Sequence, residues 1–125
     1  QYALTYPDRL PASWPRFDLS RPWDLTFQPP DTARFPCLRL AYEAGTRSGN
    51  VAAVLSTADE FAVGAFLDEG LPFPEIPAMI SSAMASHQRS VPEDSQRAVN
   101  LDSVLSADAW TRDHCRSYLS RMEQD

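Results

Sequence analysis

The chain has 125 residues, of which 43% are hydrophobic and 10% aromatic, and its formal net charge is −6. This composition is that of a folded domain and excludes an intrinsically disordered chain, and no apolar run approaches the roughly 20 residues that a membrane span needs. Residues 51–125 contain five arginines, twelve acidic residues and no lysine. Such an acidic surface repels a phosphate backbone, so we do not expect nucleic-acid binding. The short apolar runs likewise give no reason to expect membrane insertion.

Residues 1–30 have the pattern of an extended arm. Seven of the eleven prolines stand at positions 7, 11, 15, 22, 29, 30 and 36, and proline in a helix interior removes a donor and clashes with the preceding turn. The same segment carries four aromatic residues, which a flexible linker does not need: Trp14, Phe17, Trp23 and Phe27. We therefore expect an arm that lies on a surface through its rings, with a short edge strand at 24–27.

From residue 31 to the end, the pattern is helical, and we expect a mostly α fold with a small bundle of about four helices at 31–125. Leu38, Ala41 and Tyr42 lie at helical spacing within 35–45, and Gly45 is predicted to end that helix. The residues at 46–50 are predicted to form a turn.

The second helix is predicted to start at Ser56 or Thr57 and to end at Gly70. Thr57 and Glu60 fit a capping box, and Asp59 suits the positive end of the helix dipole. The adjacent carboxylates of Asp59 and Glu60 would also suit a general acid and base. The capping box explains these residues without a facing pocket, so we interpret them as structural caps. Four residues form the predicted inward face: Phe61, Ala62, Ala65 and Phe66.

Two more helices follow. Ile76, Met79, Ile80, Ala83 and Met84 keep the three–four spacing of a buried helical face. Residues 88–99 are predicted to be a loop, and Asn100 to cap a short turn at 101–105. Ser106 is the predicted cap of a last helix at 107–122, after which the chain frays. Its predicted buried face is Ala107, Trp110, Cys115, Tyr118, Leu119 and Met122.

No motif for catalysis, cofactor binding or metal binding is present. The four glycines form neither a dinucleotide fingerprint nor a P-loop. His87 and His114 belong to no metal-ligand spacing, and we interpret His114 as a surface or half-buried histidine with a satisfied ring. Cys37 and Cys115 match no metal spacing and are expected to be small buried thiols in a reducing compartment, with a disulfide between them as the less favoured alternative.

Several stretches, in order and spacing, resemble the C-terminal part of 1-deoxy-D-xylulose 5-phosphate reductoisomerase. They read YPDRLP at 6–11, DLTFQPPD at 24–31, FPCLRLAYEA at 35–44, VLSTADEFAVGAFL at 54–67, PFPEI at 72–76 and SVLSADAWTR at 103–112. The family motif Asn-Ala-Ala-Asn-Glu is replaced here by Ser56, Thr57, Ala58, Asp59 and Glu60, so only Ala58 and Glu60 match.

The resemblance implies a parent enzyme that makes 2-C-methyl-D-erythritol 4-phosphate in the non-mevalonate isoprenoid pathway, using NADPH and Mn or Mg. The family's cofactor and metal residues lie upstream of Gln1, so this chain is expected to bind no cofactor and to be inactive alone. Its implied partners are the N-terminal and central domains of the parent. The parent is expected to be a homodimer in the bacterial cytoplasm, or in the plastid of a plant or alga.

Two other hypotheses stay open at this point. The chain could be a free-standing helical interaction module whose arm holds a partner, which the departures at Ser56 and Thr57 favour and the missing initiator Met at Gln1 disfavours. A small hydrolase or metal protein built on Asp59, Glu60 and His114 is the remaining alternative.

Overall fold

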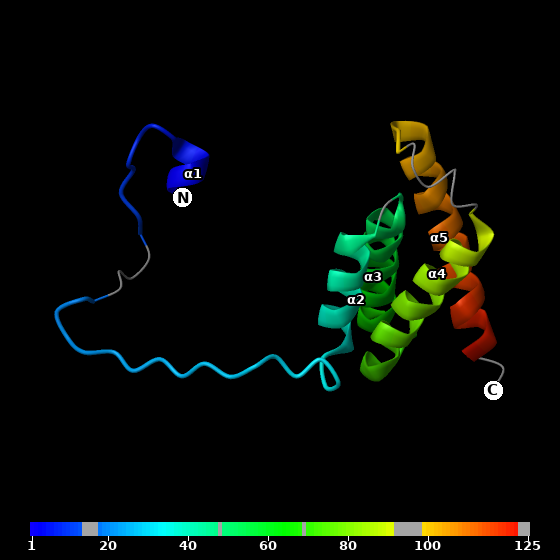
Figure 1. Ribbon diagram of the computed structural model, residues 1–125, viewed down its shortest axis with the longest axis horizontal. Helices are drawn as coiled ribbons and strands as arrows, with labels where there is room; N and C mark the ends of the chain where they lie inside the picture. Colours follow the sequence, from blue (N-terminus) through cyan, green and yellow to red (C-terminus); the bar gives the residue numbers. More distant parts are fainter. Residues whose placement is uncertain (14–17, 48, 69, 92–98, 123–125) are drawn as a thin grey trace.

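The computed structural model describes residues 1–13, 18–47, 49–68, 70–91 and 99–122, and within them it is helical and has no strand (Figure 1). A short helix, α1, lies near the N-terminus, and four longer helices form a bundle. Their bounds are α1 Tyr2–Thr5, α2 Pro36–Thr46, α3 Val51–Leu67, α4 Ile76–Ser90 and α5 Leu101–Met122, with a 3₁₀ turn, η1 Phe73–Glu75, before α4. The expectation of a mostly α fold with about four bundle helices is confirmed.

Helix α3 is central to the bundle, since it packs against α2, α4 and α5. The largest side chains that are fully enclosed come from α3, α4 and α5 and are Val54, Met79, Ile80, Thr111 and Cys115. All five predicted apolar residues of α4 are buried. The predicted face of α5 is confirmed as well, because Ala107 and Cys115 are buried and the other four residues pack against the core.

The arm leads away from the bundle and carries α1 at its far end, on the side of the molecule where α2 lies (Figure 1). Its described side chains are exposed or half-buried, including the exposed rings of Trp23 and Phe27. The predicted edge strand at 24–27 is wrong: Figure 1 draws these residues as an extended trace, and they belong to no strand in the described part of the chain. Trp14 and Phe17 lie outside the described residues.

The predicted start of the second helix at Ser56 or Thr57 is wrong, because α3 begins at Val51, more than one turn earlier. Gly49 takes a positive φ of 80° and makes the turn, so that the Asn50 carbonyl already accepts the Val54 amide at 3.0 Å. Ser56, Thr57, Asp59 and Glu60 therefore lie inside the helix and cannot cap its start.

The predicted start of the last helix is also wrong, because α5 begins at Leu101 and Ser106 lies in its second turn. The true cap is Asn100, whose Oδ1 accepts the Ser103 amide at 2.8 Å while Ser103 Oγ accepts the Asn100 amide at 3.0 Å. This reciprocal pair lets 101–105 continue into one long helix rather than form a separate turn.

Three predicted helix ends shift for local reasons. Gly45 lies inside α2, which ends at Thr46, where the Thr46 hydroxyl donates back to the Tyr42 carbonyl at 3.0 Å. Helix α3 ends at Leu67, and the amide of Gly70 donates to the Ala65 carbonyl at 2.9 Å beyond that end. Residues 88–90, predicted as loop, belong to α4; positions 92–98 and 123–125 lie outside the described residues.

Candidate functional site

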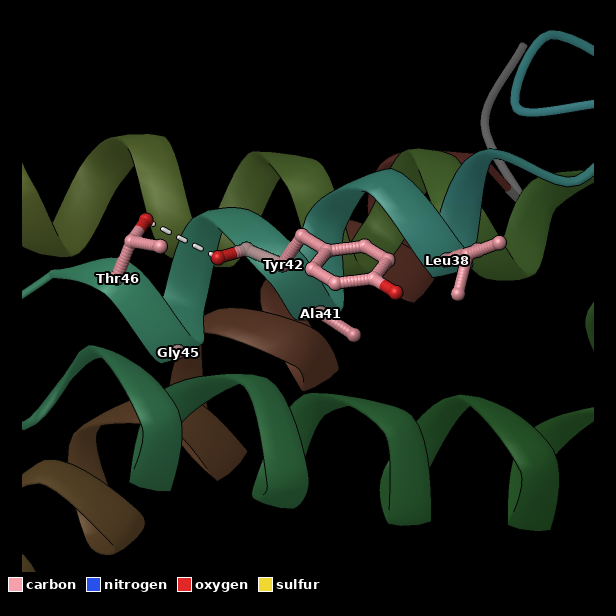
Figure 2. Close-up of a pocket in the computed structure, with 5 residues that line it drawn as sticks. All are labelled: Leu38, Ala41, Tyr42, Gly45 and Thr46. Atoms are coloured by element: carbon pink, nitrogen blue, oxygen red, sulfur yellow. Dashed lines mark hydrogen bonds between the residues drawn. The ribbon is translucent and has the colours of Figure 1, made fainter. Parts of the chain in front are cut away.

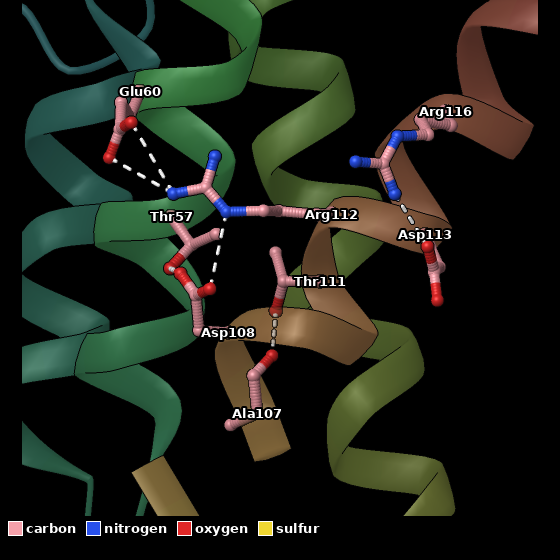
Figure 3. Close-up of polar contacts among 8 residues, drawn as sticks. All are labelled: Thr57, Glu60, Ala107, Asp108, Thr111, Arg112, Asp113 and Arg116. Carbon is pink, nitrogen blue, oxygen red and sulfur yellow. Dashed lines mark hydrogen bonds and ion pairs between the residues drawn. The ribbon is translucent and has the colours of Figure 1, made fainter. Parts of the chain in front are cut away.

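A polar network joins α3 to α5 and includes two of the residues predicted as caps (Figure 3). The buried Thr57 hydroxyl donates to Asp108 Oδ1 at 2.8 Å, and Arg112 donates from Nε to Asp108 Oδ2 at 3.2 Å. The same guanidinium reaches Glu60 with N–O distances of 3.3 and 3.4 Å. The hydrogen bond from Thr57, followed by that from Arg112, lowers the pKa of Asp108. Glu60 is therefore an ion-pair partner of α5.

The paired carboxylates that suggested acid–base chemistry face different surroundings. Glu60 is turned toward Arg112, whereas Asp59, also exposed, lines a groove beside Cys37 and Val63. Successive residues of a helix project about 100° apart, so the two carboxyl groups do not converge on one reacting atom. The catalytic interpretation of this pair has no geometric support. The network was not predicted as such: the i, i+4 spacing of Asp108 and Arg112 is visible in the sequence, but their partners on α3 are not.

The seam between α4 and α5 holds both histidines. The rings of His87 and His114 both lie near Trp110, each with its centroid 5.2 Å from the Trp110 centroid. His114 Nε2 is 3.0 Å from Ser82 Oγ, which confirms the interpretation of a half-buried, hydrogen-bonded histidine. Burial lowers the pKa of both imidazoles, and the charges of Arg121 and Arg89 add to the effect at His114.

The contact between Ser82 and His114 resembles a nucleophile with its base, but its surroundings are those of a packed seam. A working pair needs a third group that orients the imidazole and donors for an oxyanion. No carboxylate contacts His114 in the described part of the chain, and Trp110 stacks on its ring at an interplanar angle of 22°. This cluster therefore holds α4 against α5.

Neither cysteine is arranged for chemistry. Cys115 is fully buried, and burial raises its pKa to about 11, so it stays a neutral thiol at physiological pH. Cys37 is half-buried, and burial together with the charge of Asp59 raises its pKa as well. Both thiols are free. Among residues 1–13, 18–47, 49–68, 70–91 and 99–122, no three His, Cys, Asp or Glu side chains come together as metal ligands.

Two concave surfaces lie near the root of the arm. One is a hollow of about 380 Å³ on the outer face of α2, lined by Leu38, Ala41, Tyr42, Gly45 and Thr46 (Figure 2). The other is a mostly apolar groove of about 580 Å³ where α2, α3 and η1 meet, with Phe35, Val63 and Phe73 among its lining residues. Their linings offer aromatic and aliphatic contact and few polar groups, so these surfaces suit protein packing better than catalysis.

Among the described residues, none of the helices combines the length and the hydropathy that spanning a bilayer requires.

Comparison with known proteins gives consistent matches. The sequence model of the family described as "DXP reductoisomerase C-terminal domain" matches residues 1–114. A 1-deoxy-D-xylulose 5-phosphate reductoisomerase of Pelotomaculum thermopropionicum is 46% identical over 112 residues, which are 90% of this chain and 27% of that protein. The enzyme of Synechococcus sp. (strain ATCC 27144) is 40% identical over 122 residues, which are 98% of this chain and 29% of that protein.

A solved structure supports the same relationship. The crystal structure of "DOX-P Reductoisomerase in complex with NADPH, fosmidomycin and magnesium" superposes with a TM-score of 0.81 and 27% identity, over 98% of this chain and 31% of that chain. The present chain thus spans less than a third of the length of the relatives that it matches.

Proposed function

Because the chain belongs to the DXP reductoisomerase C-terminal domain family, we propose that it is the C-terminal domain of a 1-deoxy-D-xylulose 5-phosphate reductoisomerase. The parent would rearrange its substrate and reduce the product with NADPH to 2-C-methyl-D-erythritol 4-phosphate. The match over residues 1–114, which includes both the arm and the bundle, is the observation that carries the proposal.

Within this enzyme the domain would have a structural role. Its conspicuous polar clusters, the Thr57–Asp108–Arg112–Glu60 network and the histidine seam, join bundle helices to one another. The described residues do not fit a metal, because no ligand cluster exists among them, and the sequence contains no dinucleotide-binding motif. NADPH and Mn or Mg would therefore be held by other parts of the parent, and the 125-residue chain would be inactive alone.

In the proposed domain organisation, residues 1–30 are the arm that ends the central domain, and residues 31–125 are the helical bundle. The exposed Leu25 and Phe27 support this division, since an arm that docks along other domains needs apolar side chains on its surface. The partners of the chain would be the N-terminal and central domains of the same polypeptide, in a homodimeric parent. A cytoplasmic location stays a prediction.

The size of the native polypeptide in its source cells tests this proposal. An antibody raised against the 125-residue chain would capture it, and intact mass spectrometry would weigh it. We expect a species about three times heavier than 14.0 kDa, because this chain covers 27% to 31% of its relatives. A native species of 14.0 kDa would instead favour the free-standing interaction module, whose arm would hold a separate partner.

A further inference from the structure

Helix α2 has two apolar faces, of which the bundle uses only one. Leu40 and Ala44 are buried against the core, and Cys37, one turn earlier, packs beside them. The second face consists of Leu38, Ala41, Tyr42 and Gly45, which follow the i, i+3, i+4, i+7 spacing of a packed helical stripe. We call these four residues the outer face of α2.

The outer face is exposed, although it has the composition of a packed one. Tyr42 is 69% exposed and Leu38 is 37% exposed. The charged residues of α2, Arg39 and Glu43, occupy a third face, with 3.8 Å between them. Glu43 also pairs at 2.7 Å with Arg47, the residue just after the helix. A surface helix normally turns its charged side to water and its apolar stripe to protein. The outer face therefore has the character of a contact surface.

The hollow on the outer face is lined by α2 alone and is open on its other side. All of its lining residues come from α2, and Figure 2 shows the Tyr42 and Leu38 side chains standing beside it. A Cβ atom at Gly45 would have no neighbour within 4 Å, so the bundle itself does not require glycine here. Glycine inside a helix is less stable than alanine, but it lets another backbone approach closely.

The position of α2 indicates what covers this face. In Figure 1, α2 is the bundle helix on the side toward which the arm leads. The solved reductoisomerase that superposes on 98% of this chain contains arm and bundle in a similar arrangement, although the matched part is only 31% of its length. A polypeptide of that length places most of its mass outside the arm and bundle.

We propose that the outer face of α2 is the seat on which the remainder of the same reductoisomerase polypeptide packs, through an apolar surface that fits against Gly45 and the Tyr42 ring. This inference rests on the proposed function, because it requires the larger parent chain. Tyr42 supplies the aromatic anchor that buried contact surfaces favour, and Ala41 and Gly45 leave room for a close approach.

Hydroxyl-radical footprinting read by mass spectrometry tests the inference on the unmodified protein. Oxidation of Tyr42 would be compared between the native full-length polypeptide and the 125-residue chain, with Leu105 on α5, which is 57% exposed, as the internal comparator. We expect Tyr42 to be oxidised several-fold more slowly in the full-length polypeptide, with Leu105 unchanged. Equal oxidation of Tyr42 in both proteins would overturn the inference.

The other outcomes separate the two proposals. Equal Tyr42 oxidation in a full-length polypeptide that is an active reductoisomerase would overturn this inference and leave the proposed function intact. A native polypeptide no longer than this chain would overturn both. Protection of Tyr42 that grows with the concentration of the 125-residue chain would assign the face to a second copy and overturn the occupant proposed here.

A variant pair gives an independent readout. Tyr42→Asp should lower the melting temperature of the full-length polypeptide and leave that of the 125-residue chain unchanged, because the ring is exposed only in the latter. Leu105→Asp makes the same kind of change at an exposed apolar residue away from α2 and should have little effect on either protein. A melting temperature of the full-length polypeptide that Tyr42→Asp leaves unchanged would overturn the inference.

Discussion

Replacing Gly64 with alanine should stabilise the 125-residue chain. Gly64 lies inside α3, and a Cβ atom built there meets nothing within 4 Å, so the added methyl group costs no packing. Alanine in a helix interior is favoured over glycine by about 0.8–1.0 kcal/mol. In a bundle of this size, about 1 kcal/mol corresponds to a rise of about 4–8 °C in melting temperature.

The matched control is Gly49→Ala, for which the same reasoning gives the opposite sign. Gly49 has a φ of 80°, in the left-handed region where a Cβ atom clashes with the following carbonyl oxygen. We expect Gly49→Ala to lose about 1–2 kcal/mol. Urea denaturation followed by circular dichroism measures both variants. A destabilised Gly64→Ala variant would refute the reasoning, because it would mean that α3 is packed more closely at this point than the structure shows.

Three further predictions follow from the caps, the histidine seam and the core. In urea denaturation, Asn100→Ala should lower the free energy of unfolding by about 1 kcal/mol, because it removes the cap of α5. Ser106→Ala should change it by less than about 0.5 kcal/mol. A larger loss for Ser106→Ala than for Asn100→Ala would indicate that the helix starts near Ser106. The pKa values of His87 and His114 are lowered from 6.5, so their neutral forms favour the folded state; stability should be full above pH 6.5 and decline below it. Melting curves between about pH 7.5 and 5.5 should show this decline, and replacing both histidines with glutamine should flatten it; a decline of the same slope in that variant would assign it to other groups. Met79→Ala, at a fully buried site, should lose about 2–5 kcal/mol in urea denaturation, and a loss below about 1 kcal/mol would show that the core collapses around the gap.

The buried faces of α4 and α5 could be predicted from the sequence because each is a single apolar stripe. Met79, Ile80 and Met84 repeat at helical spacing with polar residues between them, and the packing follows that pattern. The pattern at α2 was less informative, because this helix has apolar residues on two faces. Periodicity establishes a helix there, but it does not tell which stripe, that of Leu40 or that of Tyr42, faces the bundle.

Helix starts were harder to predict, since several local signals compete. Thr57 and Glu60 satisfy the capping-box pattern, yet the turn at Gly49 places the first helical turn at Val51 and leaves the pattern inside the helix. Because Thr57 and Glu60 lie inside the helix, their side chains contact α5: Thr57 donates to Asp108, and Glu60 pairs with Arg112. Such partners lie more than 50 positions apart in the sequence, and no local rule predicts them.

The edge strand predicted at 24–27 failed for a different reason. Alternation of Trp23, Leu25 and Phe27 with polar residues is typical of a strand, but a strand needs a neighbour with which to form hydrogen bonds. The bundle is helical and offers none in its described residues. The local conformation is extended, as the pattern indicates, but no neighbouring strand is available among the described residues (Figure 1).

We propose that this chain is the structural C-terminal part of a reductoisomerase and has no active site of its own. The most direct test of this proposal is NADPH oxidation, followed by absorbance, with 1-deoxy-D-xylulose 5-phosphate and Mg²⁺. The native polypeptide captured from source cells and the 125-residue chain would be compared at equal molarity. We expect oxidation by the captured polypeptide and none by the 125-residue chain. Turnover by the 125-residue chain alone, or a captured polypeptide without activity, would contradict it.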